Sequence, residues 1–153
     1  MPAQSAGILM YRCQQGSVAV LLVHPGGPFW AKKDLGSWSI PKGECGPNES
    51  AWAAAVREFA EETGVRPSGV PLPLGEVIQS RAKRITAFAL KGELETSRIK
   101  SNVFHLEWPP KSGRMQSFPE VDRAEWFPIA IAKQKIVAGQ KPLLDRLLQR
   151  IQI

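Results

Sequence analysis

The feature that most constrains this chain is a helix-forming segment from Glu49 to Thr63 that is dense in carboxylates. The segment contains neither glycine nor proline and is rich in alanine, which predicts a helix of roughly four turns. Asn48 is in position to cap its start, and Gly64 can supply the left-handed residue that ends it. Such a helix has one face to bury and one face to leave open to solvent or ligand.

Three of the carboxylates, Glu58, Glu61 and Glu62, are spaced i, i+3 and i+4, so they share one face of the predicted helix. Oxygen ligands of this kind suit magnesium, which takes one or two carboxylates and completes its shell with water and substrate phosphates. The glycine-rich loop before the helix contains Lys42, whose ammonium can bind phosphate together with backbone N–H groups. The alternative is a solvated acidic face, because like-charge repulsion costs only about a few tenths of a kcal/mol per pair.

The same segment resembles the complete Nudix box, in which glycine, five residues, glutamate and seven residues precede Arg-Glu-apolar-x-Glu-Glu-x-Gly-apolar. Every fixed position of this pattern is present between Gly43 and Val65, with Glu49 as the isolated glutamate. At ordinary residue frequencies a chance match to so many positions is rare. The chain is therefore identified as a member of the Nudix hydrolase family, whose enzymes cut a phosphoanhydride bond in nucleoside diphosphate-linked substrates.

The resemblance implies a metal site and a set of catalytic residues. Its metal ligands would be Glu58, Glu61, Glu62 and the carbonyl of Gly43, holding Mg²⁺ or, as a substitute, Mn²⁺. Glu58 and Glu61 would also be catalytic, and Lys42 would bind the phosphates. We expect the metal to lower the pKa of a water molecule that attacks phosphorus.

The resemblance also implies a supporting arginine and a general base. Arg57 would pair with Glu49 and orient the carboxylates, since its planar guanidinium suits bidentate pairing with a carboxylate. The general base would come from the box itself or from a later loop, where Glu120 is the favoured candidate and Glu125 the weaker one. An ordinary solvated carboxylate is the alternative for Glu120.

The rest of the chain is consistent with the α/β class, and the resemblance implies a Nudix fold, an α/β/α sandwich around a mixed β-sheet. Length and composition indicate one domain over residues 1–153. Leucines at helical spacing between 143 and 151 indicate a closing helix. Apolar runs and turn signals predict strands at Ala6–Arg12, Val18–His24, Gly36–Ile40, Leu74–Gln79, Ile85–Lys91, Val103–Trp108 and Ala124–Phe127.

Composition narrows the partners and the compartment. The net charge of +6 favours anionic partners, but no block of five consecutive basic residues indicates nucleic acid, so a nucleotide is the expected ligand and nucleic acid an improbable one. No apolar run is long enough to span a membrane, and the two cysteines lack metal-site or disulfide spacing. We expect a cytoplasmic protein, and the sequence does not indicate its oligomeric state.

The substrate class depends on features outside the box. Chain length and the Ser39-Ile40-Pro41-Lys42-Gly43 entry look like the branch that contains the asymmetric diadenosine tetraphosphate hydrolases, which makes a dinucleoside polyphosphate the leading expectation. Members of that branch often carry a tyrosine shortly after the box, where this chain has Arg81, Ala82 and Lys83. A (d)NTP-sanitising pyrophosphatase and a non-catalytic nucleotide-binding module are the alternatives.

Aromatic and apolar residues are expected mainly in the core. Phe59 and Val65 occupy the apolar positions of the box, and Trp52 lies two helical turns before Phe59. Buried packing is also the expected role of four further aromatics, with stacking on a nucleobase as the alternative; these are Trp30, Trp38, Phe104 and Trp108.

Overall fold

A mixed β-sheet forms the centre of the computed structural model, which describes residues 3–151. Strand order is β4-β5-β1-β2-β8, and β3 pairs with the first half of β1 on the side that β2 leaves free. The β1–β5 pair is parallel and the other pairs are antiparallel. The six strands are β1 (Ala3–Gln14), β2 (Ser17–Pro25), β3 (Lys42–Glu44), β4 (Leu72–Ser80), β5 (Lys83–Lys91) and β8 (Val121–Pro128).

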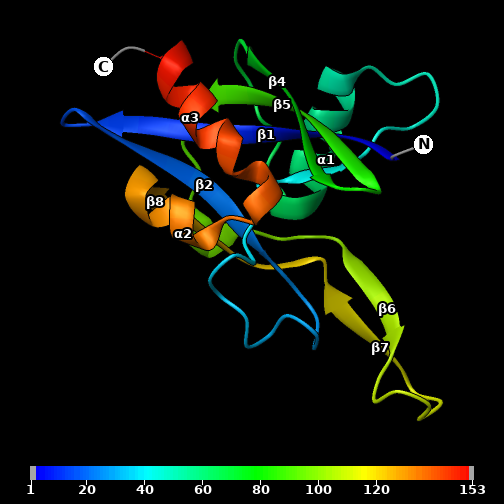
Figure 1. Ribbon diagram of the computed structural model, residues 1–153. Helices are drawn as coiled ribbons and strands as arrows, with labels where there is room; N and C mark the ends of the chain where they lie inside the picture. Colours follow the sequence, from blue (N-terminus) through cyan, green and yellow to red (C-terminus); the bar gives the residue numbers. More distant parts are fainter. Residues whose placement is uncertain (1–2, 152–153) are drawn as a thin grey trace.

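Helices cover both faces of this sheet (Figure 1). Alternation along β1 sends Ile8 and Met10 into a core beneath α1, whereas Leu9 and Tyr11 enter a second core that also contains residues of α2 and α3. The predicted α/β/α sandwich is therefore confirmed. The helices are α1 (Ala51–Thr63), α2 (Ile129–Lys135) and α3 (Lys141–Arg150), with 3₁₀ turns η1 (Thr96–Arg98) and η2 (Ala138–Gln140).

A two-stranded hairpin of β6 (Val103–Glu107) and β7 (Met115–Pro119) extends away from the sandwich (Figure 1). The first of these strands agrees with the predicted Val103–Trp108 strand, but the second was not predicted. Strand β7 lacks a clear apolar alternation, since only Phe118 in it is half-buried. In the described part of the chain, no helix has the length and apolar character needed to cross a membrane.

The start of α1 corrects one sequence prediction. The helix begins at Ala51 rather than at Glu49, and its N-cap is Ser50, whose hydroxyl accepts a hydrogen bond from the Ala53 N–H at 3.1 Å. Asn48 instead adopts a left-handed conformation with φ 60° in the preceding loop. The sequence offered two cap-forming residues close together, and only the path of the loop selects between them.

Two other predictions were wrong. The segment Gly36–Ile40 makes isolated bridges to Val23 and Ile136 but forms no continuous strand. Val65 is 39% exposed rather than buried, because it follows the left-handed Gly64 and lies beyond the last turn of the helix. Phe59, by contrast, is fully buried as predicted, and Gly64 ends the helix as predicted.

Candidate active site

The residues of the box lie on β3, on the loop after it and on α1. Strand β3 is anchored by pairing with β1, where Gly43 lies opposite Ala6. The helix buries Ala54, Ala55 and Phe59 against the sheet, so its charged residues are left on the opposite side. This arrangement places a polar helix face beside the backbone of the β3 loop.

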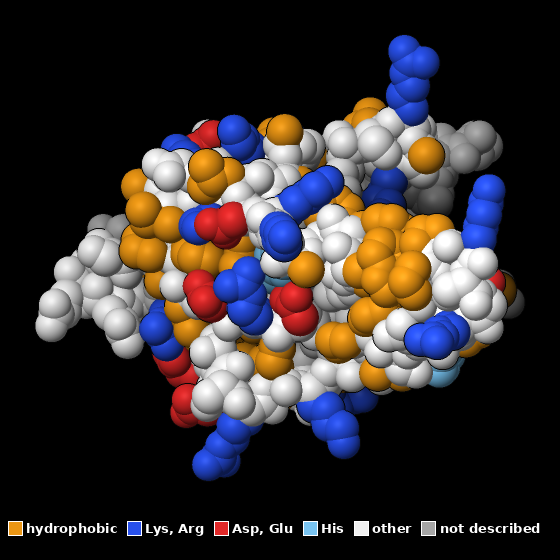
Figure 2. Space-filling view, turned by 90° about the horizontal axis from the view of Figure 1, so that it is seen from below, with side chains coloured by type: hydrophobic (Ala, Val, Ile, Leu, Met, Phe, Trp, Pro, Cys, Tyr) orange, Lys and Arg blue, Asp and Glu red, His pale blue; other side chains and the backbone are white. Residues whose placement is uncertain are grey.

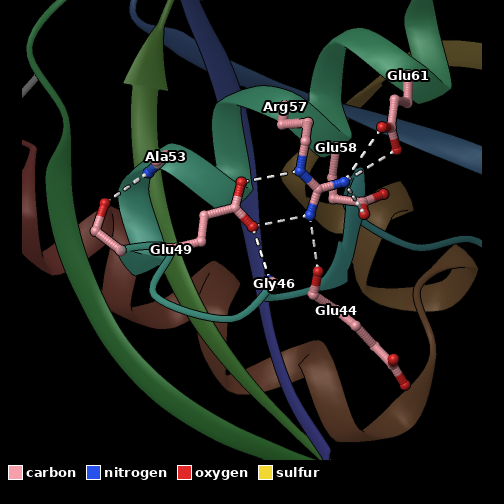
Figure 3. A network of polar contacts seen from close by, with 8 residues as sticks. Glu44, Gly46, Glu49, Ala53, Arg57, Glu58 and Glu61 are labelled. Atoms are coloured by element: carbon pink, nitrogen blue, oxygen red, sulfur yellow. Dashed lines mark hydrogen bonds and ion pairs between the residues drawn. The ribbon is translucent and has the colours of Figure 1, made fainter.

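Arg57 is the centre of the polar network on that face (Figure 3). It donates to both carboxylate oxygens of Glu49, from Nε at 2.9 Å and from Nη2 at 3.0 Å, and Nη2 also reaches the Glu44 carbonyl at 2.9 Å. The predicted Arg57–Glu49 pair is confirmed. Hydrogen bonds from Arg57 and from the Gly46 N–H lower the pKa of Glu49 to about 2, so Glu49 is ionised at neutral pH.

The same arginine also contacts two of the predicted metal ligands. Its Nη1 donates to Glu58 Oε1 at 2.8 Å and to Glu61 Oε1 at 3.2 Å. Burial raises the pKa of Glu58, and the neighbouring Glu61 raises it further, while Arg57 opposes both effects. Arg57 therefore offsets part of the repulsion between two carboxylates on adjacent positions of one helix face.

Glu58 also lies directly against Gly43. A Cβ atom added to Gly43 would be 2.0 Å from the carboxyl carbon of Glu58, so no other residue type fits there without displacing the glutamate. The glycine of the box is thus required by the close approach of β3 to α1. This approach puts the backbone of Gly43 and the carboxylate of Glu58 side by side, as the predicted ligand set requires.

Glu62 faces a different part of the site. It accepts a long hydrogen bond of 3.3 Å from the Lys42 N–H and lines a cavity of about 230 Å³ together with Glu120. Burial raises the pKa of Glu62 to about 8, and the charges of Glu58 and Glu120 raise it while Lys42 opposes the shift. A nearby cation would therefore stabilise the ionised form of Glu62.

Two lysines line the same cavity. Lys42 comes from β3, and Lys83 comes from the start of β5. Burial lowers the pKa of Lys42, and the adjacent Lys83 lowers it further, against the opposing charge of Glu62. Two neighbouring ammonium groups in a partly enclosed space favour an anionic ligand with more than one charge.

Glu120 reaches the cavity from the turn between β7 and β8, far along the chain from the box. Its backbone is held on both sides, because its N–H donates to the Asn102 carbonyl at 2.8 Å and its carbonyl accepts from the Gly26 N–H at 2.9 Å. Burial raises the pKa of Glu120, and the charge of Glu61 adds to the shift. The weaker candidate, Glu125, is exposed on β8 and does not line this cavity.

The donor set suits a hard divalent cation in chemical type, since it consists of carboxylates and a carbonyl. Within residues 3–151, however, no group of three or more His, Cys, Asp or Glu side chains is gathered closely enough to hold a metal ion. Arg57 bridges Glu58 and Glu61, and Glu62 faces the cavity instead. The metal assignment therefore stays a prediction, supported by residue type and by the contact between Glu58 and Gly43.

The cavity also contains residues that the sequence did not single out as a site. Gln79 from β4 and Ser39 are two of these residues. Trp30 also lines the cavity and is 39% exposed, so the buried packing expected for Trp30 was wrong. No sequence signal marks Gln79, because its neighbours in the cavity are distant along the chain. The sequence marked Lys83 only by its place after the box, next to Arg81 and Ala82.

The remaining aromatics divide between core and surface. Trp38 is buried at 1% exposure, as predicted, and Trp52 packs edge-on against Phe88 with ring centroids 5.2 Å apart. Trp108 makes a similar edge contact with Phe29, at 5.3 Å between centroids.

Figure 2 shows a face where acidic and basic side chains intermix beside hydrophobic ones, with Lys and Arg side chains extended at its rim.

Comparisons with known proteins place this geometry in a family. The model of the NUDIX domain matches residues 1–147. The asymmetrical bis(5′-nucleosyl)-tetraphosphatase of Caenorhabditis elegans is 34% identical over 65 residues, which is 42% of this chain and 43% of that protein. The match thus spans less than half the length of that relative.

Solved structures share the fold at low sequence identity. The NUDIX domain of Shewanella oneidensis NrtR, solved with ADP ribose, has a TM-score of 0.67 at 18% identity, with 99% of this chain and 90% of that chain covered. The Caenorhabditis elegans Ap4A hydrolase binary complex has a TM-score of 0.60 at 21% identity, covering 97% and 96%. The MutT protein from Methanosarcina mazei has a TM-score of 0.61 at 18% identity, covering 97% and 95%. With a family model matched over nearly its whole length, this chain belongs to the NUDIX domain family.

Proposed function

We propose that this protein is a magnesium-dependent hydrolase that cuts a phosphoanhydride bond in a nucleoside diphosphate-linked substrate. The observation that carries the proposal is the cavity in which Lys42 and Lys83 lie beside Glu62 and Glu120. Lysines can bind the phosphates, and carboxylates with raised pKa values are suited to a cation or a proton. The adjoining face of α1 supplies the remaining carboxylates.

Each protein group has a separate part in the proposed reaction. Lys42 and Lys83 bind and orient the diphosphate, and Arg57 holds Glu58 and Glu61 in place. The carbonyl of Gly43 with Glu58, Glu61 and Glu62 would hold Mg²⁺, which lowers the pKa of a water molecule and offsets phosphate charge when it is bound.

Glu120 is the proposed general base that takes the proton from the attacking water molecule. Its raised pKa brings it closer to neutral pH, where a base both stays ionised and accepts a proton readily. Hydrogen bonds to Asn102 and Gly26 hold the backbone of Glu120, so the point from which its side chain extends is fixed. The base thus comes from a segment distant in sequence from the other catalytic residues.

The proposed substrate is a dinucleoside polyphosphate, and diadenosine tetraphosphate is the first compound to test. The similarity to an asymmetrical bis(5′-nucleosyl)-tetraphosphatase supports this choice. A second candidate is a nucleotide-binding module without turnover, favoured by the NUDIX domain of NrtR that was solved with ADP ribose. A (d)NTP-sanitising pyrophosphatase is the third candidate, for which the fold similarity to a MutT protein is the support.

The test is a panel assay with Mg²⁺ in which diadenosine tetraphosphate, ADP-ribose, normal and oxidised dNTPs and a dinucleotide cofactor are each incubated with the protein. Products are separated by chromatography, and omission of Mg²⁺ and the Glu62→Gln variant are the controls. ATP plus AMP from diadenosine tetraphosphate would support the proposed substrate, and selective cleavage of another compound would reassign it. Binding without cleavage of any compound would contradict the hydrolase proposal and favour the binding module.

A further inference from the structure

The buried side-chain amide of Gln140 contacts the amide of Gln79, which lines the proposed substrate cavity. Gln140 in η2 is fully buried and makes three side-chain hydrogen bonds. Its Oε1 accepts from the Ile40 N–H at 3.0 Å, and its Nε2 donates to Ser39 Oγ and to Gln79 Oε1, both at 2.9 Å. Every hydrogen-bonding group of this amide faces a partner of the opposite kind.

The orientation of the Gln140 amide follows from its backbone partner. The Ile40 N–H can only donate, so the Gln140 atom that faces it must be the oxygen. The amide nitrogen of Gln140 must then face Ser39 and Gln79. Since Ser39 Oγ already donates to the Ile40 carbonyl at 2.7 Å, it is free to accept from Gln140.

The orientation of Gln79 follows in turn. The atom of Gln79 that meets the Gln140 nitrogen must be an acceptor, so its Oε1 is engaged and its Nε2 faces away from Gln140. Within residues 3–151, no protein acceptor takes Gln79 Nε2, and this atom is not sealed from solvent. Gln79 lines the cavity, and because its oxygen is already engaged by Gln140, its amide nitrogen is the side-chain group available to a ligand there.

The backbone keeps this arrangement in place. Gly139 approaches β4 so closely that an added Cβ would lie 2.5 Å from the Gln79 Cα atom. This backbone contact holds η2 against β4 and so keeps Gln140 within hydrogen-bonding distance of Gln79. The donor at the cavity surface is therefore oriented before a ligand arrives.

We propose that Gln79 is a specificity-determining residue whose Nε2 donates a hydrogen bond to an acceptor atom of the bound nucleotide, and that Gln140 is the positioning residue that fixes this polarity. The inference rests on the proposed function of the cavity as the substrate site. The acceptor is an atom of the nucleobase edge or a phosphate oxygen, and both need the same neutral donor.

The proposal can be tested without relying on turnover. Titration calorimetry with the folded full chain measures the binding of ADP, GDP and inorganic pyrophosphate. Gln79→Met keeps the length of the side chain but removes the donor, so affinity should fall roughly five- to tenfold for the ligands that use it. If the acceptor is on the base, ADP and GDP lose affinity and pyrophosphate does not. If it is a phosphate oxygen, all three lose affinity alike. Gln14→Met, at an exposed site outside the cavity, is the matched control.

Gln140→Glu tests the positioning role through a residue that does not line the cavity. One carboxylate oxygen of this variant still accepts from the Ile40 N–H. The other can no longer donate, so Ser39 Oγ has to turn its hydrogen from the Ile40 carbonyl toward residue 140, and Gln79 has to turn its nitrogen inward and its oxygen toward the ligand. Affinity should fall by about the same factor as in Gln79→Met. The double variant should show no further loss, whereas a merely structural effect of residue 140 would add to that of residue 79.

Unchanged affinity for all three ligands in Gln79→Met would overturn the inference, and so would a wild-type chain that binds none of them. A chain that cleaves nothing in the substrate panel but shows the expected binding losses would contradict the hydrolase proposal alone. The two failures are thus distinguishable.

Discussion

The two sides of the candidate site, the box residues on α1 and the cavity beside them, are built in different ways. On one side, α1 and the loop before it bring the box residues together from a single short stretch, and Arg57 connects Glu49, Glu58 and Glu61 within it. On the other side, the cavity wall is assembled from β2, the loop after it, β4, β5, the β7–β8 turn and Val137, the residue before η2. The comparison indicates that the box residues are brought together by local sequence, whereas the cavity wall depends on contacts between segments that are distant in the sequence.

The largest expected effect is on the local side. Glu61→Gln and Glu62→Gln each remove a negative charge from the proposed metal site, so turnover should fall by roughly two to three orders of magnitude. The measurement is kcat at saturating Mg²⁺ on whichever substrate the panel identifies. Circular dichroism should be unchanged, since neither glutamate belongs to the apolar core that α1 packs against.

The matched control is Glu125→Gln, the same substitution at an exposed position on β8 outside the cavity. It should retain wild-type turnover. Near-normal turnover in a folded Glu61→Gln or Glu62→Gln variant would refute the metal assignment for that residue.

Glu120→Gln tests whether the non-local wall contributes to the chemistry as well as to selectivity. Loss of a general base should reduce kcat by roughly a hundredfold. The wild-type rate should fall with falling pH as Glu120 becomes protonated, at a pKa held above 4.5 by burial and by Glu61. The pH–rate profile of the variant should lack this acid limb, and an unchanged profile would exclude Glu120 as the base.

The cap of α1 gives a smaller effect, on stability. Ser50→Ala removes the hydroxyl that accepts the Ala53 N–H, which should lower the free energy of unfolding by about 1 kcal/mol in urea denaturation. Ser68→Ala, at an exposed position outside the helices and strands, is the control and should change little. Equal stability of Ser50→Ala and wild type would show that this cap does not determine where the helix begins.

The smallest effect concerns the loop that lines the cavity wall. Asp34 accepts from Trp38 Nε1 at 2.8 Å and pairs with Lys135, and these hydrogen bonds lower its pKa below 3.8, with Lys135 having the larger effect. A carboxyl whose pKa is lowered by folding stabilises the protein at pH values above its ordinary pKa. That contribution is lost as the pH falls through the lowered value.

Asp34→Asn should therefore be slightly less stable than wild type at neutral pH, and the difference should shrink as the pH falls below 3.8. Thermal unfolding across this pH range is the measurement, with Asp145→Asn on the exposed side of α3 as the control. A difference that stays constant with pH would mean that the charge of Asp34 does not anchor the loop.

Most of the local side of the site could be predicted from the sequence by itself. The spacing of Glu58, Glu61 and Glu62 determined that they share a helix face, and the Arg57–Glu49 pair followed from the box. Gly64 could be assigned as the helix stop because few other residues adopt a left-handed conformation easily. Apolar runs and turn signals located most of the strands, whereas the sandwich was implied by the resemblance of the box to the Nudix family.

Only the tertiary structure decided the other side. The choice of Ser50 over Asn48 as the cap depends on the path of the loop, and the encounter of Gln140 with Gln79 depends on the packing of η2 against β4. The physical reason is the range of the interactions. Helical and strand periodicities act between residues close in sequence. Burial, the orientation of the amides and the proximity of Lys42 to Lys83 arise only after distant segments have packed together.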